Sequence, residues 1–189
     1  EVAGLLASGP AVLIEDDPYG ELRFAGEHLP FVASLMGDGA VADCRAVLLG
    51  TFSKIVAPGL RLGWICAGRE IMERLVVAKQ AADLHSNGFA QRVIHRWLLD
   101  HDLEAHIARI REAYGRQRDL MVELAGKLFP PEVKVTRPEG GMFLWVTLPE
   151  KCSALELFER AVAEKVAFVP GQAFFADGGG QNTLRLNFS

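Results

Sequence analysis

Near the start of the chain, three short apolar runs each give way to a cluster of polar, proline or glycine residues. The runs cover residues 11–14, 46–50 and 61–67, and the first two contain no alternating polar positions. Continuous runs of this length are typical of strands buried on both faces of a sheet that helices cover. In open α/β sheets, ligands bind at the carboxyl ends of the strands. We therefore predict an α/β fold whose site residues directly follow these runs.

Helical periodicity dominates the middle of the chain. The pattern predicts helices over residues 70–82, 88–99 and 103–128, and the last has the clearest period. At roughly 1.5 Å per residue, the last helix would measure about 39 Å, long enough to bridge two domains. Pro130 and Pro131 follow it and would stop it.

Beyond Pro131 the pattern changes to short elements. We predict strands at 133–136, 142–148, 166–169 and 183–189, and a helix at 154–164. These elements form a smaller α+β domain over residues 131–189, whereas residues 1–130 hold part of a mixed, mainly parallel sheet with flanking helices. The chain starts without Met in what reads as the end of a helix, and it stops directly after a strand. We expect it to be incomplete at both ends.

Composition argues against several classes of protein. The formal net charge is −4 and no basic face is evident, which gives no support for nucleic-acid binding. No apolar run approaches the roughly 18 residues of a membrane span, and no signal peptide is visible. Cys44, Cys66 and Cys152 are widely spaced and the five histidines lack helical pair spacing, so neither a disulfide framework nor a metal site is expected. We expect a cytoplasmic protein without membrane contact.

Lys54 is the first candidate for chemistry. It follows the second apolar run and precedes a Pro-Gly turn. A lysine among small and apolar neighbours can act as an amine nucleophile toward an aldehyde. The hydroxyls of Thr51 and Ser53 and the guanidinium of Arg61 together suit a phosphate group. The alternative is a surface lysine beside a solvated loop.

Three further residues are candidates at strand ends or on strands. Asp16 and Tyr19 follow the first apolar run, although Asp, Pro and Gly there also suit an ordinary turn. Arg185 lies on the polar face of the last predicted strand, where a bidentate grip on a carboxylate is natural. The alternative for Arg185 is a solvated strand residue.

The order of these groups resembles that of fold-type I, class I/II aminotransferases, which use pyridoxal phosphate (PLP). The resemblance rests on the segments IEDDPYGELRF (14–24), GTFSKIVAPGLRLGWI (50–65), ADLHSNGFAQ (82–91), PEGGMFLW (138–145), FVPGQAFF (168–175) and NTLRLNFS (182–189). It is strongest to the branch containing 2-aminoadipate and kynurenine aminotransferases and the aminotransferase-like domains of GntR-type regulators. It covers nearly the whole chain.

The resemblance implies a role for each candidate. Lys54 would carry PLP as a Schiff base and would shuttle a proton as general base and acid. Asp16 would pair with the pyridine nitrogen, and Tyr19 with the 3′ oxygen. The remaining implied roles are Pro18 in the pocket wall, Thr51, Ser53 and Arg61 at the phosphate, Arg185 at the substrate α-carboxylate, and Gly140 and Gly141 at close backbone approaches. The implied activity is transfer of an amino group from an α-amino acid to a 2-oxo acid.

The same resemblance also implies what this chain lacks and which alternatives stay open. Family members carry an N-terminal half that contributes to the cofactor site, and a C-terminal helix, and they are typically homodimers. The chain alone is therefore expected to be inactive or to bind the cofactor weakly. One alternative is a PLP-binding effector domain of a GntR-type regulator, and another is a PLP-dependent β-lyase or decarboxylase.

Overall fold

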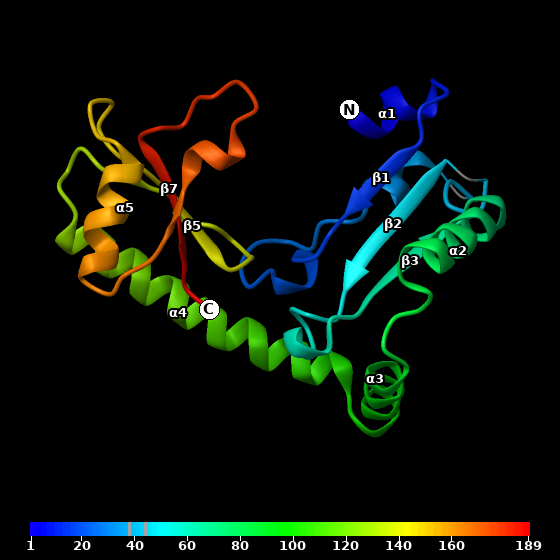
Figure 1. Ribbon diagram of the computed structural model, residues 1–189. Coiled ribbons are helices and arrows are strands. Elements are labelled where there is room, and N and C mark those ends of the chain that lie inside the picture. Colours follow the sequence, from blue (N-terminus) through cyan, green and yellow to red (C-terminus); the bar gives the residue numbers. More distant parts are fainter. Residues whose placement is uncertain (38, 44) are drawn as a thin grey trace. The chain divides into compact units, whose positions relative to one another are not determined.

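The computed structural model describes residues 1–37, 39–43 and 45–189 (Figure 1); Cys44 is outside this set. The chain forms two compact units. One comprises Glu1–Leu22 and Glu27–Arg109, and the other comprises Arg23–Gly26 and Ile110–Ser189. The division falls within a helix, between Arg109 and Ile110, whereas the sequence pattern placed a boundary near Pro130.

The first unit is built on a three-stranded sheet in the order β1-β2-β3. Its strands are β1 (Leu13–Asp16), β2 (Ala46–Thr51) and β3 (Gly63–Ala67); its α-helices are α1 (Val2–Ala7), α2 (Arg69–Asp83) and α3 (Gly88–Asp100); short 3-10 turns cover Gly20–Leu22, Val32–Met36 and Pro58–Leu60. Strand β1 runs parallel to β2, but β3 runs antiparallel to it. The described sheet is therefore mixed, as expected, but not mainly parallel, because the chain turns back directly through the Pro58–Leu60 turn into β3 instead of crossing over through a helix.

Strand burial also differs from the expectation of strands covered on both faces. Strand β1 alternates between partly buried and exposed residues, and Ile14 is 68% exposed. Leu13 packs beside a small cluster formed by Ala33, Ala40 and Ala46, which covers one face. Among the described residues the other face of β1 has no such cover, which explains the alternation.

A second cluster joins α3 to the segment that follows β2. Leu62, Ala90 and Ile94 are buried in it, and Phe52 and Val56 pack against them. Helix α3 starts at an N-cap, Asn87, whose side-chain oxygen accepts from two backbone N–H groups of the first turn. This cap gives α3 a defined start.

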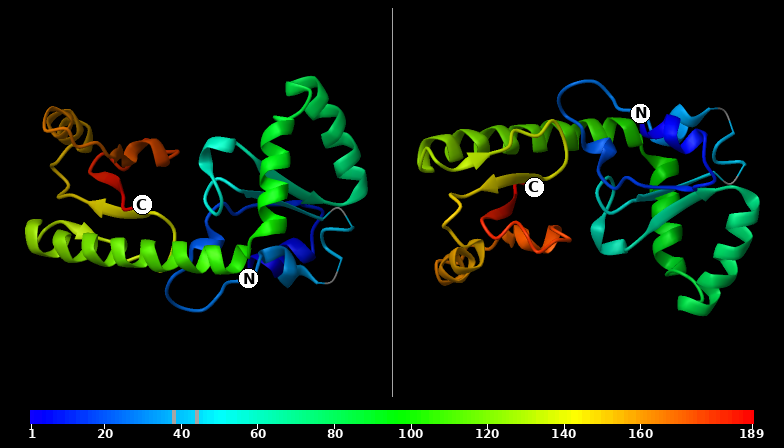
Figure 2. Two further views of the ribbon diagram at one scale, coloured as in Figure 1. Left: turned by 90° about the horizontal axis from the view of Figure 1, so that it is seen from below. Right: turned by 90° about the horizontal axis from the view of Figure 1, so that it is seen from above.

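The second unit holds a four-stranded antiparallel sheet in the order β4-β5-β7-β6. Its elements are β4 (Lys134–Val135), β5 (Phe143–Thr147), α5 (Ala154–Ala163), β6 (Val169–Pro170), a 3-10 turn at Gly171–Phe174, and β7 (Thr183–Asn187). Helix α5, capped by Ser153, packs on this sheet through Ala154 against Val146 and Leu184 (Figures 1 and 2). The unit combines an antiparallel sheet with the helix α5 that packs on it.

Helix α4 (Leu103–Leu128) has the bounds that its apolar period and the following prolines predicted. Ile107 and Ala125 are buried on it. In the described part of the chain, no helix combines the length and apolar character needed to cross a membrane. No group of three or more His, Cys, Asp or Glu side chains is gathered for a metal ion among those residues.

Candidate functional site

The parallel pairing of β1 and β2 brings two candidate segments to one edge of the sheet. Asp16 pairs in register with Leu49, so both strands end on the same side (Figure 1). The segment after β1 carries Tyr19, and the segment after β2 carries Lys54. This is the carboxyl edge, where open α/β sheets bind ligands.

A tight turn presents Lys54. The carbonyl of Phe52 accepts from the backbone N–H groups of Val56 and Ala57 at 2.9 and 3.0 Å, which closes the turn around the lysine. Phe52 and Val56 anchor the turn in the α3 cluster. Lys54 is half-buried and its Nζ lies 5.9 Å from the centroid of the Tyr19 ring. Its amine has no hydrogen bond or ion pair with any residue described, so it is available for chemistry.

Asp17 holds the Tyr19 segment in shape. Its Oδ1 accepts from the backbone N–H groups of Tyr19 and Gly20 at 3.3 and 2.6 Å. A Cβ at Gly20 would lie 1.9 Å from Asp17 Oδ2, so the turn requires glycine there. The sequence analysis named Asp16 as a candidate and did not name Asp17. An Asp side chain often accepts a hydrogen bond from the backbone two residues further on and so favours a turn, and this pattern could have identified Asp17.

Asp16 and Pro18 lie on either side of this anchoring residue. Asp16 is exposed at the end of β1, and its carboxylate makes no hydrogen bond or ion pair within the described residues. Pro18 is half-buried. A carboxylate without an internal partner can pair with a protonated ring nitrogen of a ligand.

Ser53 and Arg61 form the anion-binding part of the site. Arg61 Nη1 donates to Ser53 Oγ at 3.4 Å and to the carbonyl of Pro58 at 3.1 Å. Arg61 has a left-handed backbone with φ 53°, which the Pro58–Leu60 turn imposes. The serine hydrogen and the other guanidinium N–H groups remain for a phosphate.

Thr51 has a different place from the one expected. Its Oγ1 accepts from the backbone N–H of Ser53 at 3.0 Å and donates to the carbonyl of Leu62 at 3.2 Å. A hydroxyl has one hydrogen to donate. Because that hydrogen is used at Leu62, the geometry makes Thr51 a residue that orders the loop, with Ser53 and Arg61 as the donors toward an anion.

These residues fit the PLP implied by the sequence resemblance. A free amine, a phenol ring, an unpaired carboxylate and a pair of anion donors all lie in one unit, on the two segments that leave the same sheet edge. PLP requires one group of each kind: an amine for its aldehyde, a carboxylate for its ring nitrogen and donors for its phosphate. The site suits that cofactor on its donor chemistry alone.

Arg185 lies in the second unit, in the middle of β7. Its guanidinium carbon is 4.0 Å from the centroid of the Phe143 ring and 4.7 Å from that of Phe174. Its Nε is buried and has no hydrogen-bond partner among the described residues. The guanidinium of this half-buried residue therefore contacts two aromatic rings.

The turn before β5 carries the glycines expected at close approaches. Gly140 forms an isolated antiparallel bridge with Arg23, and Gly141 has φ 79°. Arg23 also forms an ion pair with Glu139. This pairing fastens the Arg23–Gly26 segment to the second unit, and sequence reasoning could not have found it, because the partners lie far apart in the chain.

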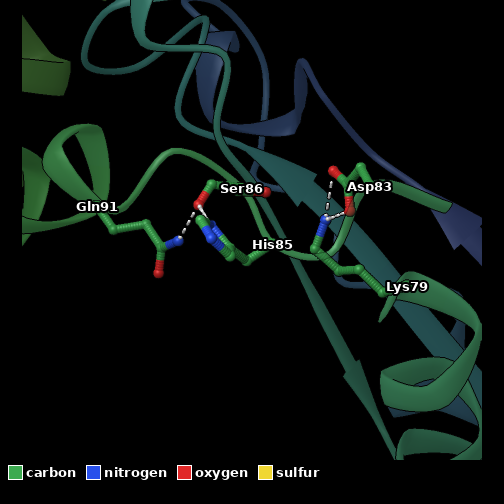
Figure 3. A network of polar contacts seen from close by, with 5 residues as sticks. All are labelled: Lys79, Asp83, His85, Ser86 and Gln91. Atoms are coloured by element: carbon green, nitrogen blue, oxygen red, sulfur yellow. Dashed lines mark hydrogen bonds and ion pairs between the residues drawn. The ribbon is translucent and has the colours of Figure 1, made fainter. Parts of the chain in front are cut away.

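The link between α2 and α3 is ordered by a polar network (Figure 3). Lys79 Nζ donates to both carboxylate oxygens of Asp83 at 2.8 and 2.9 Å, and the carbonyl of Ser86 contacts His85 Nδ1 and Gln91 Nε2, both at 3.0 Å (Figure 3). The link and the Phe52 turn border a hollow of about 560 Å³. The network therefore sets the position of α3 beneath the Lys54 turn.

Comparison with known proteins gives one consistent family. The sequence profile described as "Aminotransferase class I and II" matches residues 1–189. The aromatic-amino-acid aminotransferase 1 of Thermococcus litoralis is 44% identical over 94% of this chain and 42% of its own length. The crystal structure of alpha-aminoadipate aminotransferase from Thermus thermophilus, complexed with N-(5'-phosphopyridoxyl)-L-leucine, matches with a TM-score of 0.91 and 41% identity, over 99% of this chain and 47% of that one.

A regulator is also similar, at lower identity. The uncharacterized HTH-type transcriptional regulator YjiR of Escherichia coli is 34% identical over 93% of this chain and 36% of its own length. The chain thus spans less than half the length of each of these three proteins.

Proposed function

Because the chain belongs to the class I and II aminotransferases, we propose that it supplies the lysine-bearing part of a PLP-dependent enzyme that transfers an amino group from an α-amino acid to a 2-oxo acid. The observation that carries the proposal is the unpaired amine of Lys54, held 5.9 Å from the Tyr19 ring on a turn that also bears Ser53. The similarity to alpha-aminoadipate and aromatic-amino-acid aminotransferases supports an α-amino acid as the donor.

Each residue of the first unit has one task in this proposal. Lys54 would hold the cofactor covalently through Nζ, and its amine, once the substrate amine has displaced it, would move the proton between the substrate α-carbon and the cofactor's C4′. Asp16 pairs with the ring nitrogen, and Tyr19 donates to the 3′ oxygen. Ser53 and Arg61 bind the phosphate, Thr51 orders their loop, and Pro18 contributes to the pocket wall. When bound, PLP supplies an electron sink that stabilises negative charge at the α-carbon.

Arg185 binds the α-carboxylate of the substrate in this proposal. A guanidinium offers two parallel N–H donors that match the two oxygens of a carboxylate. Its Nε has no partner among the described residues, which leaves it without an internal carboxylate to satisfy it. A carboxylate-binding arginine suits reactions that remove the α-proton and retain the carboxyl group, which favours transamination over decarboxylation.

Assembly and location belong to the same proposal. We place the active enzyme in the cytoplasm as a homodimer, with part of each site supplied by sequence beyond the length of this chain. The chain by itself is then expected to bind PLP weakly and to turn over slowly.

The test is covalent labelling of the purified chain. PLP is added, the visible absorbance is recorded, borohydride is applied and the modified peptide is mapped by mass spectrometry. We expect the adduct on Lys54, its loss in Lys54→Ala, and its retention in Lys151→Ala, which removes an exposed lysine of the second unit. Labelling that scatters over surface lysines, both in this chain and in the chain joined to an N-terminal half, would refute the assignment of Lys54 as the residue that binds PLP.

The regulator alternative keeps the same cofactor residues but predicts no turnover. The similarity to YjiR is the observation that keeps it open. The full-length protein, loaded with PLP and given an amino acid and a 2-oxo acid, separates the two functions. Formation of a new amino acid supports the enzyme, and a stable Lys54 adduct without product supports the effector domain. Release of CO₂ or of a β-substituent would instead indicate the decarboxylase or β-lyase.

A further inference from the structure

The guanidinium of Arg185 lies between two phenyl rings that come from different elements. Phe143 is the first residue of β5, and Phe174 is the last residue of the 3-10 turn that follows β6. The guanidinium carbon lies 4.0 Å from one ring centroid and 4.7 Å from the other. Both separations are within the roughly 6 Å over which a ring face attracts a cation.

The two rings are themselves held in place. Trp145 pairs in register with Arg185 across β5 and β7. Its indole meets the Phe174 ring edge to face, with centroids 5.6 Å apart, and it also contacts Phe175 at 6.2 Å. Phe143 is fixed by the β5–β7 ladder, where it pairs with Asn187. The Phe174 ring therefore has a support other than the arginine, and the ladder holds the backbone of Phe143 in place.

This arrangement restricts how Arg185 can bind an anion. Both rings contact the guanidinium, and Nε is buried without a partner in the described chain. The terminal nitrogens are then the donors left for a ligand. Two parallel N–H donors of this kind match the two oxygens of a carboxylate.

We propose that Phe143 and Phe174 are positioning residues that hold the Arg185 guanidinium so that its terminal nitrogens bind a carboxylate. This inference rests on the proposed function only in assigning the carboxylate to the substrate. A lysine at position 185 could still contact the rings as a cation but would lack the fork of donors that binds both carboxylate oxygens. The two rings thus hold in place the guanidinium that binds the carboxylate.

The test measures binding to Arg185 separately from cofactor loading. The Arg185 Nε–H signal is assigned in the ¹⁵N-labelled chain through Arg185→Lys, and pyruvate serves as the simplest 2-oxo carboxylate. We expect an upfield ring-current shift of this signal in the parent chain and a pyruvate-dependent change that gives the Kd. Phe143→Leu and Phe174→Leu should each reduce the ring-current shift and raise the Kd by roughly two- to thirty-fold, the range expected for one cation–π contact.

Two variants separate positioning from general packing. Phe174→Tyr keeps a ring face and should restore the parent Kd, and Phe158→Leu is the matched control because Phe158 contacts Phe168 in the same unit at 5.5 Å, away from the arginine. Phe174 is 48% exposed, so its replacement does not empty a core. An unchanged Kd in both leucine variants, an equal loss in Phe158→Leu, or no pyruvate response in the parent chain would overturn the proposal.

The borohydride label on Lys54 keeps the two ideas distinguishable. Normal labelling of Lys54 with no effect of the rings overturns only the positioning role. Ring-dependent pyruvate binding without labelling of Lys54, both in this chain and in the chain joined to an N-terminal half, would refute the proposed function and leave the positioning role intact.

Discussion

Lys54 Nζ lies 5.9 Å from the centroid of the Tyr19 ring, although the two residues stand on separate turns that follow β1 and β2. The parallel pairing of those strands brings the turns to one edge, and the anchoring of Phe52 and Val56 directs the lysine turn. The lysine is thus held beside an aromatic face by groups that take no part in chemistry.

We expect the Tyr19 ring to support cofactor loading on Lys54. Tyr19→Phe removes only the hydroxyl that is proposed to donate to the 3′ oxygen, so it should lower the labelled fraction of Lys54 at subsaturating PLP about two- to twelve-fold, the worth of one hydrogen bond. Tyr19→Ala removes the ring as well and should lower that fraction further. Quantitative mass spectrometry of the reduced adduct measures both. Tyr114→Ala removes a ring from the other unit and should have no effect; an equal loss there would contradict the idea.

Thr51 should matter for the stability of the loop more than for contact with a phosphate. Thr51→Val keeps the shape but removes the hydroxyl that bonds Ser53 N–H and the Leu62 carbonyl. Losing these bonds should lower the free energy of unfolding by about 1–3 kcal/mol, measured by urea titration. Thr51→Ser keeps the hydroxyl and should retain most of the free energy of unfolding of the parent chain. A valine variant as stable as the parent would show that the two hydrogen bonds contribute nothing net.

Gly50 should not tolerate a side chain. A Cβ there would lie 2.2 Å from the indole of Trp64 on the neighbouring strand, so β2 and β3 would have to separate or the indole would have to move. We expect Gly50→Ala to lower the free energy of unfolding by about 1–3 kcal/mol, as overpacking does. Gly59→Ala is the control, because open space surrounds that position. Equal urea midpoints for the two variants would contradict the clash.

Arg118 should contribute far more to the stability of the second unit than Arg116, which lies two residues before it on α4. It is 6% exposed, bonds the carbonyl of Pro138 and lies 4.8 Å from the Phe24 ring centroid. We expect Arg118→Ala to lower the free energy of unfolding by about 1–3 kcal/mol, because the half-buried carbonyl of Pro138 loses a charged donor. Arg116→Ala breaks an exposed pair with Glu112 and should change stability by less than about 0.5 kcal/mol. Thermal or urea unfolding of both variants is the measurement, and similar losses would refute the ranking.

Local signals determined the helices of this protein. Helix α4 begins at Leu103 and ends at Leu128, as the apolar period and the following prolines predicted, because both signals act within a few residues along the chain. The cap at Asn87 and the position of Lys54 after β2 were also readable, since each depends on neighbouring residues.

Tertiary pairing decided the direction of the strands and the surroundings of the functional groups. The residues of an apolar run do not indicate whether the neighbouring strand is parallel or antiparallel to it. The antiparallel direction of β3 was therefore not predicted. The hydrogen bond that occupies the Thr51 hydroxyl ends on Leu62, and its partner could be identified only once β2 and β3 were paired. An alternating strand pattern likewise shows only that Arg185 faces away from Leu184 and Leu186.

The sequence by itself thus determined the family, the candidate site residues and which segments are helical, because motifs and periodicity are short-range. The tertiary structure alone decided what each side chain touches. Arg185 acquires its two rings from residues distant in the chain, and those contacts exist only after the β5–β7 ladder and the Gly171–Phe174 turn have formed. The physical reason is that a contact between distant residues depends on backbone pairing, which no local pattern encodes.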